Sequence, residues 1–252
     1  MARLLDNVHS NVPDEFHLAV GIGAIPQWAI FRKFGMNDAV SSGREDMWPL
    51  GTVRVLPATA GVVTLTSSDA ADTMTSGTGA WNVRVEGLDE NYYEISEDVD
   101  LAGLSNSAST AEFLRINRMY ILQSGTTDYN EGNITATIGG AAQSYIEFHE
   151  GQTHQSMYTV PANKHLMIDH AQLGVGRVSG SNDVAVQMAI KPFGLSWRTI
   201  ADVFLFNGQS HATQGLATLM PGKTELRMQI LSSTTTQAYG IFAGYLITDL
   251  DV

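Results

Sequence analysis

Apolar and polar residues alternate most clearly between residues 78 and 101. The first alternating run ends in a polar turn at residues 87–91, and a second run follows directly after it. The apolar positions are Trp81, Val83 and Val85 in the first run, and Tyr93, Ile95, Val99 and Leu101 in the second. A period of two on both sides of a turn is typical of an antiparallel strand pair with one buried face. The pattern therefore predicts a β-hairpin.

Short runs of the same kind continue from Thr52 to the end of the chain, separated by clusters of Ser, Thr, Asn, Asp and Gly. The predicted strands are residues 53–56, 61–67, 81–86, 92–101, 113–122, 132–138, 145–148, 155–160, 165–174, 183–192, 196–207, 224–231 and 236–247. Closely spaced strands rich in β-branched and aromatic residues favour an all-β fold, either an antiparallel β-sandwich or a jelly roll. No helical heptad pattern competes with this interpretation.

The first fifty residues lack this regularity and are predicted to form an irregular N-terminal arm. A short helix could open after Pro13 and end near Gly21 and Gly23. Four of the large aromatic residues of the segment are Trp28, Phe31, Phe34 and Trp48. The segment either packs across the main core or docks on a neighbouring subunit, and we assign these four aromatic residues to a subunit interface. On that assignment, deleting residues 1–35 should impair assembly more than folding.

A weak boundary at residues 139–142 divides the rest of the chain. The predicted organisation is an arm at residues 1–50, a β lobe at 51–140 and a second β lobe at 141–252. The two lobes are either stacked or interleaved in a single sandwich, and the sequence leaves both possibilities open.

Composition narrows the possible partners. Of 252 residues, 44% are hydrophobic and 16% charged, and the formal net charge is −12. Nucleic acid is an unlikely partner because phosphate binding needs clusters of Lys and Arg. The chain has no cysteine, no signal-peptide pattern and no apolar run long enough for a membrane span. We expect a soluble protein whose neutral surface is partly covered by other subunits.

The motifs with potential chemistry are all weak. His149 and His154 are five residues apart rather than the four of a zinc-protease helix, and Gly151 lies between them. His165 and His170 fall on opposite faces of a predicted strand. No phosphate-binding loop or nucleophile motif is present. We expect a protein that is not an enzyme, with no catalytic residues and no cofactor.

The acidic strand at residues 94–100 is the best candidate for a ligand-binding site. Glu94, Asp98 and Asp100 could together bind a hard cation such as Ca²⁺. The alternative, which we favour, is a solvated outer face or a subunit contact, with no bound metal. A carbohydrate-binding surface would need exposed tryptophans. Trp81 and Trp197 are instead expected to lie in the core.

Several segments resemble one known family. The hairpin carries the pattern Thr-Gly-Ala at 78–80, Gly-Leu-Asp at 87–89 and Glu-Ile-Ser-Glu at 94–97. Further similar segments, in the same order, are residues 31–37, 45–48, 113–118, 132–135, 158–162 and 221–224. Together they resemble structural proteins of tailed bacteriophages, especially marine ones.

The resemblance implies a component of the virion, assembled in the cytoplasm of a host bacterium. It suggests a decoration or cement protein that stabilises the head as a homo-oligomer, with a trimer preferred. Its partners would be the major capsid protein or other virion proteins, with no nucleic acid and no membrane. The alternatives are a tail, knob or fibre component that contacts the host, and a carbohydrate-binding β module.

Overall fold

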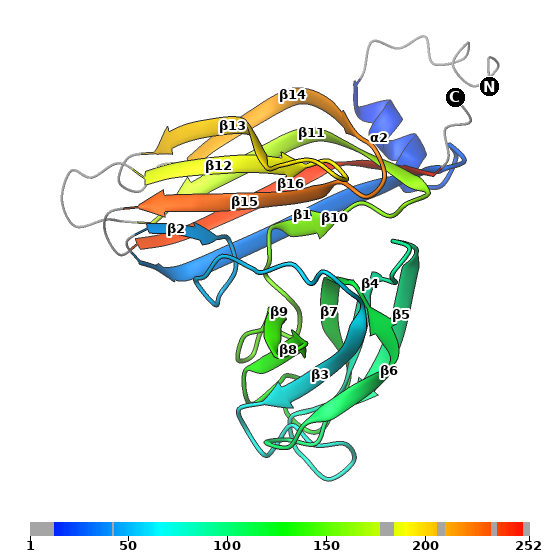
Figure 1. Ribbon diagram of the computed structural model, residues 1–252, viewed down its shortest axis with the longest axis vertical. Coiled ribbons are helices and arrows are strands. Elements are labelled where there is room, and N and C mark those ends of the chain that lie inside the picture. Colours follow the sequence, from blue (N-terminus) through cyan, green and yellow to red (C-terminus); the bar gives the residue numbers. More distant parts are fainter. Residues whose placement is uncertain (1–12, 42, 177–183, 206–209, 233–235, 249–252) are drawn as a thin grey trace.

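The protein consists almost entirely of antiparallel β-strands. The computed structural model describes residues 13–41, 43–176, 184–205, 210–232 and 236–248, although the side chains of residues 13–15 and 213–217 are not described. Its strands form four small sheets, which are grouped into two lobes (Figure 1). The all-β, antiparallel class predicted from the sequence is confirmed. Among the described residues, no helix is long and apolar enough to cross a membrane.

The larger lobe, here called the terminal lobe, is built from both ends of the chain, residues 13–46 and 157–248. Its first sheet has the order β1-β16-β11-β14, and its second has the order β10-β15-β12-β13, with β2 also paired to β15. The strand bounds of the first sheet are β1 Trp28–Val40, β16 Thr236–Thr248, β11 Lys164–Val175 and β14 Ser210–Met220. Those of the second are β10 Met157–Thr159, β15 Glu225–Ser232, β12 Val184–Lys191, β13 Arg198–Leu205 and β2 Gly43–Asp46.

The smaller lobe, here called the central lobe, comprises residues 61–146. One sheet has the order β6-β3-β8-β9 and the other β5-β4-β7. The bounds of the first are β6 Ser107–Phe113, β3 Gly61–Ser67, β8 Ile134–Ile138 and β9 Ala141–Ile146. Those of the second are β5 Glu94–Asp100, β4 Ala80–Leu88 and β7 Arg115–Ser124. The hairpin expected from the alternating pattern is the β4–β5 pair, in which Val83 lies opposite Val99.

Each lobe has its own apolar core, which lies between its two sheets. In the terminal lobe, Phe242 of β16 and Ile168 of β11 belong to the same buried cluster as Met228 of β15. In the central lobe, Leu65 of β3 shares a cluster with Val85 of β4. Since burial of apolar area is the main favourable term in folding, each pair of sheets is stabilised chiefly across its own interior.

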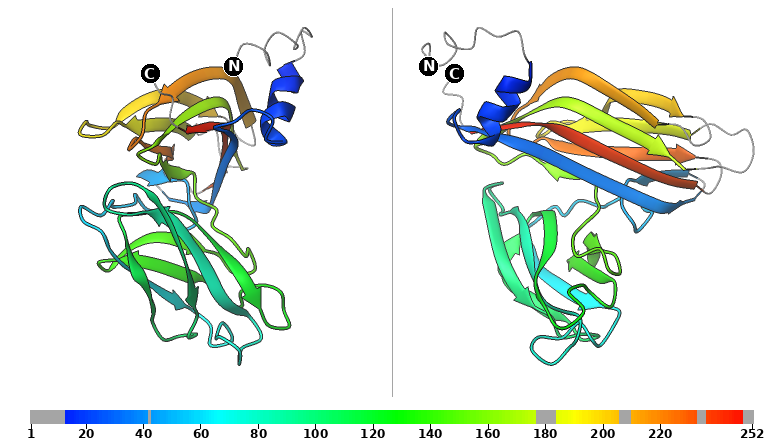
Figure 2. Two further views of the ribbon diagram at one scale, coloured as in Figure 1. Left: turned by 90° about the vertical axis from the view of Figure 1, so that its right-hand side faces the viewer. Right: turned by 180° about the vertical axis from the view of Figure 1, so that it is seen from behind.

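One helix, α2 (Pro13–Gly21), covers one end of the first sheet of the terminal lobe (Figure 2). Proline is favourable in a first helical turn because its missing N–H would have no partner there. Phe16 packs edge-on against Trp28 and Tyr245, with ring centroids 5.3 and 5.2 Å apart. The Tyr245 hydroxyl also lies 2.6 Å from His17 Nδ1. The short helix expected between Pro13 and Gly21 is therefore present.

The rest of the predicted N-terminal arm is not an arm. Residues 28–40 form β1, which pairs with β16 along its length, and residues 43–46 form β2. The alternation was hidden because apolar side chains lie on both faces of β1: Phe31 faces the core, whereas Trp28 and Ile30 are on the opposite face. Deleting residues 1–35 would remove more than half of this strand together with buried Phe31, so we expect the deletion to impair folding as well as assembly.

The predicted boundary at residues 139–142 is also wrong. Gly139 and Gly140 form the two-residue turn of the β8–β9 hairpin, with φ values of 58° and 81°. Both positive values suit glycine, and such turns match the twist of paired strands. The chain instead passes between the lobes at residues 47–60 and 147–156. Four small sheets around two cores are not a clear jelly roll, and β6 and β14 are not among the predicted strands.

The core of the terminal lobe can be tested at Phe242, which is fully buried between the two sheets. We expect Phe242→Ala to lower the free energy of unfolding by about 3–5 kcal/mol, because it removes apolar contacts and leaves a cavity. Phe204→Ala is the matched control, since Phe204 is 62% exposed and should change stability by less than about 0.5 kcal/mol. Urea unfolding followed by circular dichroism measures both, and equal losses would contradict the described core.

Candidate functional site

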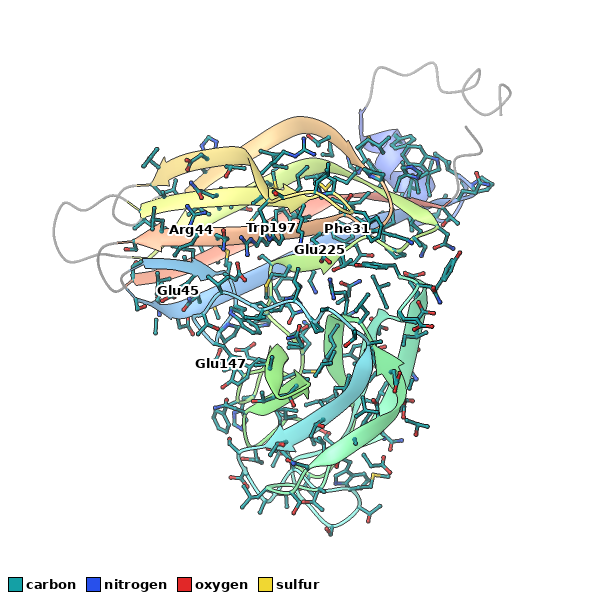
Figure 3. The ribbon with its side chains drawn as sticks, in the orientation of Figure 1. Phe31, Arg44, Glu45, Glu147, Trp197 and Glu225 are labelled. Carbon is teal, nitrogen blue, oxygen red and sulfur yellow. The ribbon has the colours of Figure 1, made fainter. Side chains whose placement is uncertain are left out.

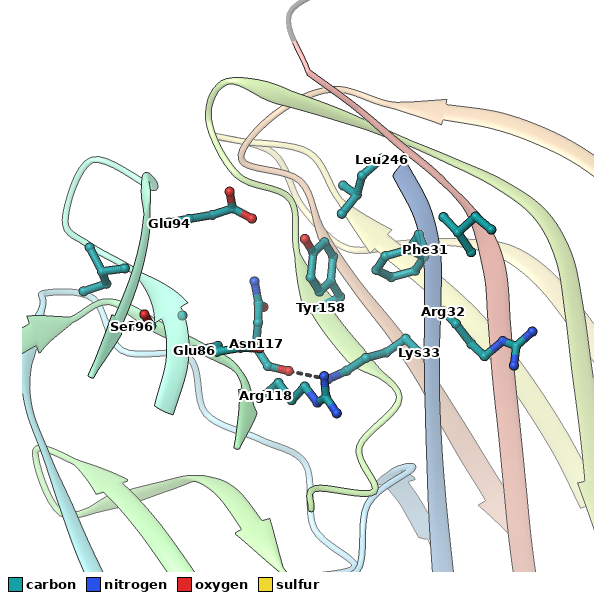
Figure 4. A pocket seen from close by; sticks show the side chains of 13 residues that line it. Phe31, Arg32, Lys33, Glu86, Glu94, Ser96, Asn117, Arg118, Tyr158 and Leu246 are labelled. Carbon is teal, nitrogen blue, oxygen red and sulfur yellow. Dashed lines mark hydrogen bonds between the residues drawn. The ribbon is translucent and has the colours of Figure 1, made fainter. Parts of the chain in front are cut away.

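A cavity lies where the two lobes meet. It has a volume of about 460 Å³, with β1, β10 and β16 on the side of the terminal lobe and β4, β5 and β7 on the other side (Figure 4). Cavities at domain interfaces are common places for binding sites. Its lining includes charged groups from both lobes, among them Lys33, Glu86, Glu94 and Arg118.

Lys33 is the least expected of these groups because its side chain is buried. It projects from β1, is 8% exposed, and donates a hydrogen bond from Nζ to the backbone carbonyl of Asn117 on β7. Burial lowers the pKa of Lys33 to about 7, and the positive charges of Arg54 and Arg118 contribute in the same direction. The amine therefore links the two lobes while it is close to losing its charge at neutral pH.

Tyr158 lies next to Lys33 on the side of the cavity formed by the terminal lobe (Figure 4). Its ring packs against Phe31, with centroids 4.8 Å apart. Burial raises the pKa of Tyr158 well above its ordinary value, and the negative charges of Glu94 and Glu86 add to this effect. The phenol thus stays protonated, and the cavity presents an amine and a hydroxyl as hydrogen-bonding groups.

Side-chain and backbone groups exchange hydrogen bonds directly across the junction. Asn117 of β7 donates from Nδ2 to the carbonyl of Thr159 at 2.9 Å, and the Thr159 amide returns a bond to Asn117 Oδ1 at 2.9 Å. The side chain of Asn117 thereby forms one donated and one accepted hydrogen bond with the Thr159 backbone, as a paired residue in a β-ladder does. Buried polar groups are costly unless they have such partners, so these bonds fix how the two lobes sit against each other.

A buried ion pair strengthens the same junction. Arg115 of β7 lies 2.7 Å from Glu225 of β15, and both side chains are less than a tenth exposed. Glu225 is on the side of the terminal lobe that faces the central lobe (Figure 3), where it also accepts a hydrogen bond from the hydroxyl of Thr159. Arg115 donates further to the carbonyls of Pro57 and Leu114. Removing one partner would leave the other charge buried and unpaired.

A second buried network anchors the connecting segment 47–60. Asp46 accepts hydrogen bonds from the Arg54 amide at 2.7 Å and from Gln229 at 2.8 Å. Burial raises the pKa of Asp46, while the positive charge of Arg227 opposes that effect. The guanidinium of Arg54 reaches the carbonyls of Ile116 and Gln143 in the central lobe. The described polar groups at the junction thus act mainly as structural ties between the lobes.

A different candidate surface lies on the outside of the first sheet. Side chains of β1 and β16 that point away from the core form an apolar surface that begins beside the end of α2, where Ile30 approaches Gly21. We call it the open face and define it by Ile30, Phe34, Met36, Tyr239 and Ile241. Ile30 is 52% and Tyr239 38% exposed. Contiguous exposed apolar side chains of this kind are typical of protein interaction surfaces.

The four aromatic residues predicted for a subunit interface separate into two groups. Phe31 and Trp48 are only 5% and 1% exposed and lie in the interior, so their assignment to an interface is wrong. Trp28 and Phe34 are partly exposed on the outer side of β1, where Trp28 contacts α2 and Phe34 contacts His154. Buried and exposed aromatic residues in one run cannot be distinguished without knowing which face of the strand is covered.

The acidic row on β5 is not arranged around a cation. Asp98 forms an ion pair with Arg84 at 2.6 Å, and Glu94 forms one with Lys164 at 2.6 Å. Asp100 is exposed at the end of the strand. The histidines singled out from the sequence are also dispersed, since His149 approaches Glu131 and His154 approaches Glu150. No cluster of three metal-binding side chains occurs among the residues that the structure describes.

The residues that join the lobes are not among the site residues predicted from the sequence. Lys33, Arg115 and Glu225 each lie within or beside an apolar strand segment. A charged residue flanked by large apolar residues, as in Phe113-Leu114-Arg115-Ile116, is a signal that could have identified them. The partner of each charge, however, lies more than eighty residues away in the chain.

Comparisons with known proteins give no family. No family model and no curated protein matches the chain. Among solved structures, the similar ones include chains of infectious bursal disease virus. For the Gx strain the identity is 10% and the TM-score 0.25, with 88% of this chain and 72% of that chain covered. For the T13 viral particle the identity is 12% and the TM-score 0.25, with 87% and 69% covered. Such low TM-scores do not indicate a shared fold.

The buried amine predicts how stability depends on pH. The folded state holds the pKa of Lys33 at about 7, against 10.5 in a model amine, so between these values the unfolded chain binds the extra proton. Stability should therefore rise with pH from about 7 to 10, by at most about 1.4 kcal/mol per pH unit from this residue. Lys33→Met should be more stable than the parent at pH 7. Its stability should lack the rise between pH 7 and pH 10 that Lys33 causes in the parent.

Unfolding free energies measured in urea at several pH values, for the parent and for Lys33→Met, test this prediction. Lys164→Met is the control, because Lys164 is paired with Glu94 at the surface. The prediction fails if the difference in stability between the parent and Lys33→Met stays constant from pH 7 to pH 10.

Proposed function

We propose that this chain is a non-enzymatic structural protein of a virus particle. In this role it decorates the head and stabilises the shell through contacts between copies of itself, with a trimer as the expected oligomer. The observation that carries the proposal is the open face, a partly exposed apolar surface on a sheet whose other side is packed into a core. Burial of such a surface between subunits is a common source of stability in oligomers.

The junction between the lobes supports a mechanical role. Several described charged groups at the junction are engaged across it: Arg115 pairs with Glu225, and Lys33 donates to a backbone carbonyl of the central lobe. This arrangement holds two β lobes in one fixed orientation. A subunit that transmits load within a shell needs such rigidity, whereas an active site needs reactive groups that are free to meet a substrate.

Charge and sequence resemblance fit the same role. The net charge of −12 suits a position away from packaged nucleic acid. The resemblance of the hairpin at residues 78–101 to structural proteins of tailed phages suggests the major capsid protein or another virion protein as the neighbour. The protein would then be located in the virion, after assembly in the cytoplasm of the host bacterium.

The open face can be tested by placing a charge on it. We expect Ile30→Asp to reduce the oligomer to smaller species, since an aspartate there would have to be desolvated at the contact. Phe204→Asp is the control, because Phe204 is also exposed but lies on β13 of the other sheet. Light scattering coupled to gel filtration measures the mass, and circular dichroism confirms that each variant is folded. An unchanged mass for Ile30→Asp would contradict the role of the open face.

The position on the particle requires a separate experiment. Phage particles made without this protein should have heads that lose DNA or break at lower temperature, while their tails stay complete. Electron micrographs of heated particles report both properties. Normal heads with missing tail parts would instead favour a tail, knob or fibre component.

A further inference from the structure

A second pocket lies at the junction, on the side where three turns meet. Its volume is about 360 Å³, and the turns are those between β4 and β5, between β12 and β13, and between β14 and β15. The side chains that matter for its chemistry are Tyr92, Arg115, Lys191, Phe193, Lys223 and Glu225. A pocket of this size can enclose one small ligand.

Positive charge is concentrated in this pocket although the protein as a whole is acidic. Lys191 and Lys223 are two of only four lysines in the sequence. Arg115 and Glu225 neutralise each other at 2.7 Å, which leaves the two ammonium groups unbalanced. Among the described residues, no carboxylate lies within ion-pair distance of either lysine. The pocket therefore carries a local net charge of opposite sign to that of the chain, and it favours an anion.

Aromatic and apolar side chains form the walls beside these charges. The rings of Tyr92 and Phe193 meet edge-to-face, with centroids 5.7 Å apart, and Lys223 Nζ lies 5.4 and 5.1 Å from the two ring centres. Phe193 is 62% and Leu195 52% exposed at the rim. A ligand that fits this combination has an anionic group joined to a body with an apolar face.

The backbone around the pocket is held in an unfavourable conformation. Tyr92 and Lys223 have φ values of 67° and 65°, in the left-handed region that non-glycine residues rarely adopt. The Tyr92 carbonyl accepts a hydrogen bond from Ala162 at 2.8 Å, and the Lys223 amide donates to Val160 at 2.8 Å. These bonds hold the backbone of both turns in place, and such local strain is often found at functional sites.

We propose that this pocket binds an acidic sugar residue, with the sugar carboxylate between the ammonium groups of Lys191 and Lys223. The C–H face of the pyranose ring packs against Phe193 and Tyr92. Burial raises the pKa of Tyr92, so its hydroxyl stays protonated and can donate to a sugar hydroxyl. The volume of about 360 Å³ suits a single sugar residue better than an extended acidic peptide. This binding activity goes beyond the structural role proposed above and does not depend on it.

The test uses the purified full-length protein and four probes: galacturonate, galactose, acetate and inorganic phosphate. We expect galacturonate to bind at least about tenfold more tightly than galactose, which lacks the carboxylate, and than acetate, which lacks the ring. Binding of galacturonate should weaken as salt is raised, because the lysines are partly open to solvent. Isothermal titration calorimetry and ligand-observed NMR measure these affinities.

Each alternative outcome overturns a defined part of the proposal. Equal binding of acetate or phosphate would show a site for bare anions or acidic protein groups and exclude sugar recognition. Equal binding of galactose would exclude the role of the lysines, and no binding by any probe would overturn the whole proposal. None of these results depends on whether the protein assembles on a particle, so failure here is distinguishable from failure of the proposed function.

Variants locate the binding in this pocket. Lys191→Gln and Lys223→Gln should each weaken galacturonate binding by about tenfold, since each removes one charge-assisted hydrogen bond. Lys164→Gln makes the same change in a lysine that is paired with Glu94 outside the pocket, and it should leave the affinity unchanged. Thermal unfolding confirms that all three variants are folded. Equal losses in all three would mean that net charge alone is responsible, which would overturn the assignment.

Discussion

The arrangement of this protein depends on the polar contacts that are buried between its two lobes. Arg115 and Glu225 form an ion pair with little access to solvent, and Asn117 exchanges two hydrogen bonds with Thr159. Lys33 adds a third tie across the larger cavity. Directional bonds of this kind specify a single relative orientation, whereas an apolar contact of equal area would tolerate sliding. The open face and the smaller pocket both have fixed positions because of this junction.

The path of the chain explains why the junction is so well connected. Described segments from the N-terminal and C-terminal parts of the chain, residues 13–41 and 236–248 among them, lie in the terminal lobe, and the central lobe is inserted between β2 and β10. The polypeptide therefore crosses between the lobes twice, at residues 47–60 and 147–156. β1 from the N-terminal part pairs with β16 from the C-terminal part, so the terminal lobe closes only when distant segments have met. Contacts of such long range are slow to form during folding.

The functional surfaces follow from this construction. The open face is available because α2 covers only one end of the first sheet, leaving Ile30 and Tyr239 exposed. The smaller pocket exists because turns from both lobes meet beside the Arg115–Glu225 pair. In the roles proposed above, the apolar open face would contact other copies of the chain and the charged pocket would bind an external ligand, each in a separate region.

The sequence by itself determined the all-β class, the β4–β5 hairpin and the short helix after Pro13. These features depend on local periodicity and on turn residues, which act over a few positions. The tertiary structure alone decided that residues 28–46 belong to the sheets, that Gly139 and Gly140 form a hairpin turn, and which aromatic residues are buried. It also decided which charges meet, since Lys33 and Asn117 or Arg115 and Glu225 are far apart in the chain. Residue pattern records whether one face of a strand is apolar, but not which distant segment will cover it.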